Sequence, residues 1–195
     1  MSQSFFEYGK KSGENYLKKM DKDRHLLLVY EDFEKAIDLQ INYLKRGLEN
    51  GEVCILAMPY EFDMEQKMKL KGIEVEKYKK KNLLYIFKDM ELKEPSSDLF
   101  SKFSKKILSV SSKPLRICAM LNIDMSTKEG MNAFLEAETA SHAGFQTFRG
   151  SWLCSYDIKK MEKEEKIRWV KKLLKCHDSV IFAPSHESGI AMDLS

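Results

Sequence analysis

Six short runs of apolar residues recur along the chain, and each is long enough for one β-strand. They contain many β-branched and aromatic side chains and do not alternate strictly with polar residues. This pattern is typical of strands that are covered on both faces in a parallel sheet. The predicted strands are His25–Tyr30, Val53–Met58, Leu83–Phe87, Leu115–Leu121, Ser151–Tyr156 and Ser179–Ala183.

Between these runs, apolar residues spaced by three and four positions predict amphipathic helices. The predicted helices begin at Phe33, Met64, Pro95, Ser126 and about Lys160, and the first two end at Asn50-Gly51 and Gly72. The segment Ser126-Thr-Lys-Glu129 has the sequence of a capping box, in which the Ser and Glu side chains each bond the other residue's backbone amide. This box predicts the start of the fourth helix.

Strands that alternate with helices in this way predict one α/β domain. We expect a three-layer α/β/α sandwich with a mainly parallel sheet of about six or more strands and right-handed crossovers. The 195 residues suffice for one hydrophobic core and are too few for two typical domains. Residues 22–195 are therefore assigned to a single domain, and residues 1–21 to an N-terminal helical extension that packs on the sheet edge or on a second subunit.

Composition argues against several classes of function. The 33 basic and 30 acidic residues leave a formal net charge of +3, whereas nucleic-acid binders concentrate basic charge far more strongly. No apolar stretch approaches the roughly 18 residues that cross a bilayer, and no secretory segment opens the chain. The cysteines form no C-x-x-C pair and the histidines have no tight metal-binding spacing. We therefore expect a cytoplasmic protein with no nucleic-acid or membrane partner, no metal and no cofactor.

The junction after the first strand contains only Glu31 and Asp32 before the helix begins at Phe33. Nucleotide-binding proteins of this type usually have a glycine-rich loop here, whose backbone amides bind phosphates together with Lys and Ser or Thr. This chain has neither the glycines nor the Lys-Ser/Thr pair. Two carboxylates stand where a phosphate would bind, so the sequence predicts sensing or binding in preference to phosphoryl transfer.

In open parallel sheets, ligands bind at the carboxyl ends of the strands. The residues predicted there to bind a ligand are Tyr30, Glu31, Asp124, Cys154, Tyr156 and Asp157. This edge is rich in carboxylates and tyrosines and poor in glycine and lysine, which suits a small organic ligand better than a polyphosphate. The alternative for Glu31 and Asp157 is that they cap the helices that follow.

Glu138 is predicted to lie on the same helical face as Met131 and Phe134, with His142 one turn later. A carboxylate on an apolar face needs a partner or has a raised pKa. The pair could orient a ligand or act as acid and base, and a half-solvated pair at the helix edge is the alternative. His25 and His177 are expected at the opposite, amino-terminal edge of the sheet, in structural roles.

Several short motifs resemble the MEDS domain, which is named for methanogens, methylotrophs and the dichloromethane-responsive regulator DcmR. They are His25-Leu-Leu-Leu-Val-Tyr-Glu31, Gly47-Leu-Glu-Asn-Gly-Glu52-Val-Cys54, the acidic helix at Glu136–Glu138, Cys154-Ser-Tyr-Asp157 and His177-Asp-Ser-Val-Ile181. The resemblance implies a RecA/KaiC-like fold without a phosphate loop and a ligand-sensing role, with small hydrocarbon derivatives as ligands. It carries over to Tyr30, Glu31, Glu138, Cys154, Tyr156 and Asp157, whereas Asp124 lies in a strand that departs from the family pattern.

The leading hypothesis is a stand-alone cytoplasmic sensory domain without catalytic activity. It would bind a small organic ligand and act through a signalling or regulatory protein, in transcription for example, or through self-association. One alternative is an enzyme that uses Glu138, His142 and Asp124 as acid–base groups. Another enzyme would hold a divalent ion between Glu31, Asp124 and Asp157. A third reading is a catalytically inactive ATPase-like assembly subunit.

Overall fold

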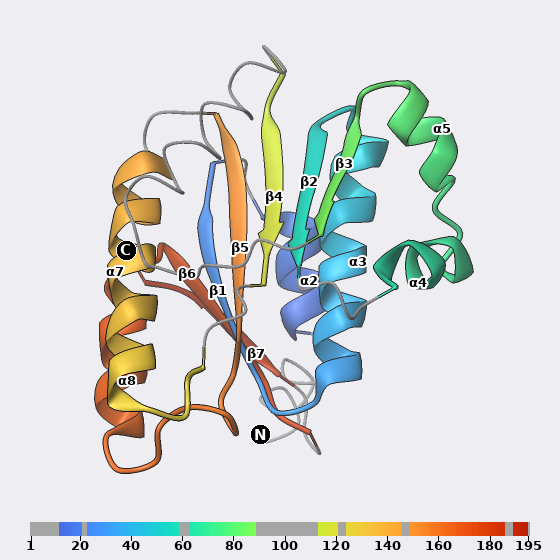
Figure 1. Ribbon diagram of the computed structural model, residues 1–195. Coiled ribbons are helices and arrows are strands. Elements are labelled where there is room, and N and C mark those ends of the chain that lie inside the picture. The colour runs from blue at the N-terminus through green and yellow to red at the C-terminus, as the bar shows by residue number, and fades with distance from the viewer. Residues whose placement is uncertain are drawn as a thin grey trace, which may run out of the picture.

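A seven-stranded sheet lies between two layers of helices (Figure 1). The computed structural model describes residues 12–20, 23–58, 63–88, 113–120, 124–145, 149–185 and 189–194. The strands are β1 (His25–Tyr30), β2 (Val53–Met58), β3 (Leu84–Lys88), β4 (Leu115–Ala119), β5 (Gly150–Asp157), β6 (Ser179–Ala183) and β7 (Ile190–Asp193). Their order in the sheet is β3-β2-β4-β5-β1-β6-β7.

The first six strands are parallel, as predicted, and β7 is antiparallel to β6. Each predicted strand matches an observed one with ends that differ by no more than two residues, although Leu121 lies outside the described residues. The sequence did not predict β7. This strand is short, and three of its four residues are exposed at the edge of the sheet, so it lacks the apolar run that marks the buried strands.

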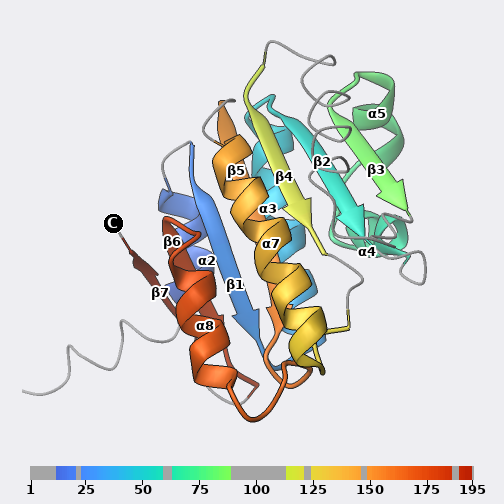
Figure 2. The same cartoon turned by 60° about the vertical axis from the view of Figure 1, so that its left-hand side comes forward.

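Helices cover both faces of the sheet (Figure 2). They are α2 (Ser12–Lys19), α3 (Phe33–Glu49), α4 (Met64–Leu70), α5 (Val75–Lys80), α7 (Lys128–Phe145) and α8 (Lys166–Leu174). Helices α7 and α8 lie on one face, and α2 and α3 lie on the other. Among the residues described, no helix has the length and the apolar character needed to cross a membrane. The helix predicted from Pro95 lies outside them.

The predicted capping box at Ser126 is wrong by one residue. Helix α7 begins at Lys128, and the Thr127 hydroxyl accepts the hydrogen bond from the Gly130 amide at 3.0 Å. The Ser126 amide and hydroxyl instead bond the Asp124 carboxylate, at 2.9 and 2.7 Å. Because Ser126 bonds Asp124 in this turn, its hydroxyl does not cap the helix, and the hydroxyl of Thr127 does so instead.

The last helix is shorter than predicted, because α8 begins at Lys166 and not near Lys160. Glu162 accounts for the difference. Its carboxylate accepts bonds from the Glu164 and Glu165 amides and, at 2.9 Å, from the indole N–H of Trp169. These bonds fix a turn before the helix, so the chain is not helical there.

The pairing of β1 with β5 decides which side chains share a face. His25 pairs with Trp152, and Leu27 pairs with Cys154, in parallel register. Paired residues of parallel strands point to the same side, and successive residues alternate. His25, Cys154 and Tyr156 therefore point toward α7 and α8.

The opposite face of the sheet meets α3. Gln40 of α3 donates to the Ser155 hydroxyl at 2.9 Å, and the Tyr43 hydroxyl donates to Ser151 at 2.7 Å. Both hydroxyls come from β5 residues that alternate with those facing α7. The α3 face of the sheet therefore contains its own buried hydrogen bonds between polar side chains.

The α3 face of the sheet also buries an ion pair. The Arg116 guanidinium of β4 donates to both oxygens of Glu52, at 2.6 and 3.2 Å, and to the Tyr43 carbonyl at 3.2 Å. Glu52 and Arg116 are both buried. We call Arg116, Glu52 and Tyr43 the arginine cluster.

Helix α2 lies within the segment predicted as an N-terminal helical extension. It contacts α3, β6 and β7. Leu17 is buried, and the Tyr16 hydroxyl forms hydrogen bonds with Ser179 of β6, at 2.6 Å, and with Asp193 of β7. These contacts attach α2 to the edge of the sheet.

Candidate functional site

The amino terminus of α3 lies at the carboxyl end of β1, where related architectures bind phosphate. Here the Asp32 carboxylate accepts hydrogen bonds from the Glu34 and Lys35 amides, at 2.9 and 3.2 Å. These are the amides that a phosphate would need, because the first amides of a helix have no partner within the helix. The chain's own carboxylate therefore occupies the anion position.

Glu31 is held by a different segment. Its carboxylate accepts bonds from the amide and the hydroxyl of Ser185, both at 3.0 Å, just after β6. Lys35 of α3 donates to the Pro184 and Ser185 carbonyls. Glu31 thus joins the ends of β1 and β6 and does not cap α3.

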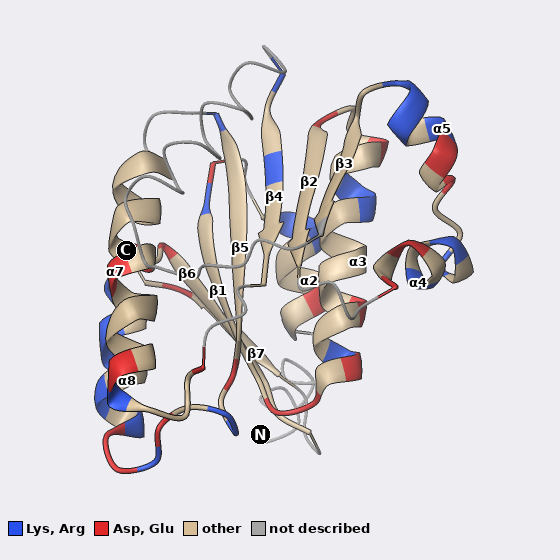
Figure 3. Ribbon diagram, in the orientation of Figure 1, with Lys and Arg blue, Asp and Glu red and all other residues tan. Residues whose placement is uncertain are grey.

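Tyr30 and Asp157 pair across the ends of β1 and β5. Burial, together with the smaller effect of the neighbouring Asp157 charge, raises the pKa of Tyr30 to about 12. The Asp157 carboxylate accepts the Lys159 amide at 2.9 Å, so it also stabilises the turn that follows β5. Tyr30, Glu31 and Asp157 therefore lie at one edge of the sheet. Figure 3 shows acidic residues at this end of the sheet.

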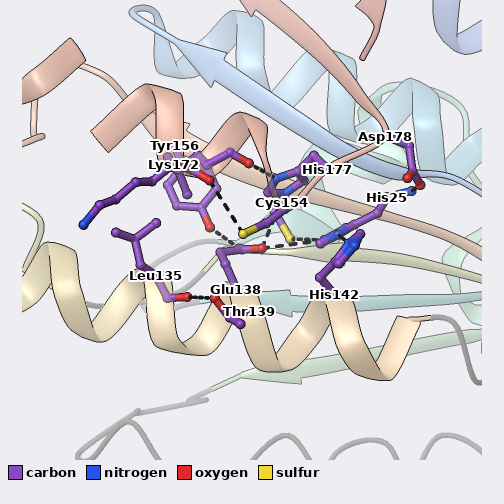
Figure 4. A network of polar contacts seen from close by, with 12 residues as sticks. His25, Leu135, Glu138, Thr139, His142, Cys154, Tyr156, Lys172, His177 and Asp178 are labelled. Carbon is purple, nitrogen blue, oxygen red and sulfur yellow. Dashed lines mark hydrogen bonds and ion pairs between the residues drawn. The ribbon is translucent and has the colours of Figure 1, made fainter. Parts of the chain in front are cut away.

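A second group of polar side chains lies deep under α7, and Figure 4 shows it from close by. His25 begins β1, Cys154 lies within β5, Glu138 is in the middle of α7, and His177 lies between α8 and β6. None of the four residues is more than 5% exposed. We call these four residues the histidine cluster.

The four side chains of the histidine cluster point toward one another (Figure 4). Glu138 Oε2 lies 3.6 Å from His25 Nε2 and 3.4 Å from His177 Nε2. The Cys154 sulfur lies 3.5 Å from His25 Nε2. One donor atom from each residue lies within 4.8 Å of all the others. In the part of the chain that the structure describes, this is the only group of three or more His, Cys, Asp or Glu residues that could hold a metal ion.

Neighbouring groups fix the orientation of these side chains. His177 Nδ1 donates to the Leu173 carbonyl at 2.7 Å, and the Tyr156 hydroxyl donates to Glu138 Oε1. His25 Nδ1 lies 3.4 Å from His142 Nδ1, and the rings of His25 and His177 stack with centroids 4.1 Å apart. Protein contacts therefore surround the cluster on its outer side and orient its side chains.

Burial governs the protonation of this region. Burial, together with the smaller effect of the nearby imidazoles of His177 and His142, lowers the pKa of His25 to about 2. Burial also raises the pKa of the Cys154 thiol and of Tyr156 well above their usual values, and the nearby Glu138 carboxyl adds to both effects. At neutral pH, His25 is uncharged and Tyr156 is protonated.

Asp124 lies apart from both groups of residues. It is exposed at the turn before α7, and its hydrogen bonds to Ser126 lower its pKa. In the described ranges, Glu31, Asp124 and Asp157 do not form a metal-binding group. His142 Nδ1 lies 3.4 Å from His25 Nδ1. The divalent-ion alternative from the sequence therefore has no assembled site among the described residues.

The structure brings together three predicted residues, Glu138, Cys154 and Tyr156, and separates them from the edge residues. The sequence placed His25 and His177 correctly at the amino-terminal edge but gave them only a structural role. One signal could have linked them, because His25 begins β1 and His177 lies just before β6, and these two strands are neighbours in the sheet. Cys154 faces the same side only through the register of β1 and β5, which the sequence does not show.

Comparisons with known proteins agree with this architecture. The family model described as the methanogen/methylotroph, DcmR sensory domain (MEDS) matches residues 24–178. No curated protein matches the chain.

Solved structures show the same fold at low sequence identity. A KaiC-like protein from the hyperthermophilic archaeon Pyrococcus horikoshii OT3 has a TM-score of 0.60 and 12% identity, over 88% of this chain and 78% of that chain. An ATPase domain has a TM-score of 0.59 and 13% identity, over 89% and 76%. An uncharacterized P. horikoshii protein in complex with an unknown peptide has a TM-score of 0.58 and 15% identity, over 88% and 83%. The chain therefore has a RecA/KaiC-like fold.

Proposed function

The chain belongs to the MEDS family of sensory domains, and on that premise we propose that it binds a small organic ligand and does not bind or hydrolyse nucleotides. The ligand-bound form associates differently with a signalling or regulatory protein, or with a second copy of the chain. A ligand can shift that association only by its difference in affinity for the two states. Catalysis is not required for this role.

The observation that carries the proposal is the carboxylate at the start of α3. Asp32 already bonds the amides of Glu34 and Lys35. A phosphate brought to the same amides would displace a good cap and would meet the negative charge of Asp32 at close range. Glu31 adds a second carboxylate on the adjoining residue. A neutral or cationic ligand meets no such penalty.

The ligand is proposed to bind at the carboxyl edge of β1 and β5. Tyr30 offers a protonated hydroxyl, and Asp157 and Glu31 offer carboxylates that are already held in place. Hydroxyl and carboxylate groups recognise alcohols and amines through hydrogen bonds. Methanol and methylamine are suitable probes, because the family description names methanogens and methylotrophs.

Thermal unfolding of the purified chain tests this proposal. One series contains methanol, methylamine or dichloromethane at increasing concentration, and a second contains ATP with Mg²⁺. We expect saturable stabilisation by at least one organic probe and none by ATP. Glu31→Gln and Tyr30→Phe should abolish the stabilisation, whereas Glu76→Gln on the distant helix α5 should preserve it. Saturable ATP binding that depends on residues 30–35 would overturn the proposal, and so would organic binding that both edge variants leave unchanged.

A further inference from the structure

The buried histidine cluster has the donor set and the spacing of a zinc site. Zn²⁺ in proteins is bound at about 2.0–2.2 Å by His nitrogen and carboxylate oxygen and at about 2.3 Å by Cys sulfur, usually with four ligands at the corners of a tetrahedron. Such a tetrahedron has edges of about 3.3–3.6 Å. Three of the six separations between donor atoms are 3.4, 3.5 and 3.6 Å, which match such an edge, and all four donor atoms lie within 4.8 Å of one another.

The hydrogen bonding of His177 leaves a gap that a cation would fill. A carbonyl oxygen only accepts, so the 2.7 Å contact with Leu173 places the proton on His177 Nδ1. With Nδ1 engaged in this bond, the second ring nitrogen, Nε2, is the one that can bind a metal, and it faces Glu138 Oε2 at 3.4 Å. Both atoms are buried, and neither has a hydrogen-bond partner within the described residues. Two acceptors facing each other in the interior are costly unless a cation lies between them.

A shared proton would be the simplest cation, and the distance argues against it. Charge-assisted N–H···O bonds are about 2.7–2.9 Å long, shorter than the 3.4 Å between His177 and Glu138. A metal ion separates its ligands by the length of a tetrahedral edge, so it explains the longer distance. It also explains why the Cys154 sulfur and His25 lie at the same spacing.

The surroundings match those of bound metals. A His ligand usually donates its second ring N–H to a carbonyl or carboxylate, as His177 does to Leu173, and a carboxylate ligand accepts a further hydrogen bond, as Glu138 does from Tyr156. One thiolate, one carboxylate and two neutral imidazoles would neutralise a divalent ion, so no net charge would be buried. All four positions come from the protein, which is typical of structural and not catalytic zinc sites.

We infer that His25, Glu138, Cys154 and His177 bind one Zn²⁺ ion that joins β1, β5, α7 and the segment before β6. This inference does not depend on the proposed ligand site, which uses other residues at the opposite end of the strands. The ion would have no open position for substrate. It would instead hold α7 and the start of β6 against the sheet.

Metal content and cobalt spectroscopy test the site in the full chain. After expression with added zinc, elemental analysis should find about one zinc per chain. The protein unfolded with chelator and refolded with Co²⁺ should show the visible bands of tetrahedral cobalt and a thiolate-to-cobalt charge-transfer band. Cys154→Ser should lose the charge-transfer band, and Glu138→Gln and His177→Gln should each lower the affinity for Co²⁺ by at least about 10-fold.

Matched variants separate this site from adventitious binding. Cys176→Ser changes a neighbouring thiol whose sulfur contacts the Lys172 carbonyl, and it should keep both the bands and the affinity. Tyr156→Phe should keep the bands but weaken binding by about 10–100-fold, because it removes only the bond to Glu138. Where a ligand variant does not fold, the wild-type chain alone decides. If the wild-type chain refolds and then takes up neither metal, or if Cys176→Ser abolishes the thiolate band, the inference is wrong.

Discussion

The two faces of the sheet each bury a polar cluster, and the two clusters differ in how completely their groups are paired. In the arginine cluster, both Glu52 oxygens accept from Arg116, and the guanidinium also lies over the Tyr43 ring at 4.7 Å. In the histidine cluster, an oxygen of Glu138 and a nitrogen of His177 face each other without a hydrogen bond among the described residues. Both clusters are buried, so burial alone does not separate them.

On the zinc inference above, this difference separates a structural ion pair from a metal-binding site. A buried charge must be paired by the protein, or else it marks a position for something the polypeptide does not supply. The chain even makes room for the arginine cluster. A Cβ atom on Gly47 would lie 2.4 Å from Arg116 Cδ and 2.7 Å from the Cys54 sulfur, so the absence of a side chain there admits the guanidinium.

The largest expected effect comes from breaking the complete pair. Glu52→Ala leaves the Arg116 charge buried and unpaired, and we expect it to lower the free energy of unfolding by about 3–5 kcal/mol. Urea unfolding at neutral pH measures the loss. The matched control is Glu52→Leu with Arg116→Met, which removes both charges and should recover most of the stability. If the double variant is no more stable than Glu52→Ala, the pair is not an isolated structural element.

The next effect probes the space around the guanidinium. Gly47→Ala places a methyl group against Arg116 and Cys54, and overpacking of this kind costs about 1–3 kcal/mol. Urea unfolding again gives the value. Combining it with Arg116→Ala, which removes the contacting Cδ atom, should make the cost of the added methyl group smaller than in the wild-type background. An equal cost in both backgrounds would show that the guanidinium does not determine the need for glycine.

Alkaline pH should affect the two clusters alike. Burial raises the pKa of Tyr43 and of Tyr156 above the value of about 10 in the unfolded chain. The unfolded state therefore loses these protons first, so the stabilisation is complete below pH 10 and is lost as the pH rises above it. Each tyrosine should contribute about 1.4 kcal/mol per pH unit to that loss.

Urea unfolding between about pH 9 and pH 11 tests the alkaline effect. Tyr43→Phe and Tyr156→Phe should each reduce the slope of stability against pH by the contribution of one group. A slope that only one of the variants changes would show that the other phenol is not protected in the folded protein.

The fold could be predicted because buried parallel strands leave a continuous apolar signature. β1 and β2 were bounded correctly to the residue for this reason, and β7 was missed because only Ala191 of its four residues is not exposed. The RecA/KaiC-like architecture expected from the resemblance is confirmed. Helix ends were less predictable, because the side chains of Asp124 and Glu162 compete for the amides that decide where α7 and α8 begin.

The histidine cluster could not be predicted for a different reason. Glu138 was noticed because a carboxylate on an apolar helical face is unusual, and Cys154 and Tyr156 because they end a strand. His25 and Cys154 are separated by 129 positions in the sequence and meet only through the register of β1 and β5. A one-residue shift in that register would turn Cys154 to the other face.

The smallest expected effect is also the sharpest test of the comparison. Glu138→Gln in metal-free protein keeps an oxygen that accepts from Tyr156 and replaces the unpaired oxygen with an amide nitrogen that can donate to His177 Nε2. We therefore expect the free energy of unfolding to stay the same or to rise by up to about 1 kcal/mol. Urea unfolding in the presence of chelator measures it, with Glu52→Gln as the matched control that should destabilise. If Glu138→Gln instead costs as much as Glu52→Gln, then the Glu138 carboxylate is already paired in the metal-free protein, and the two clusters are equally complete.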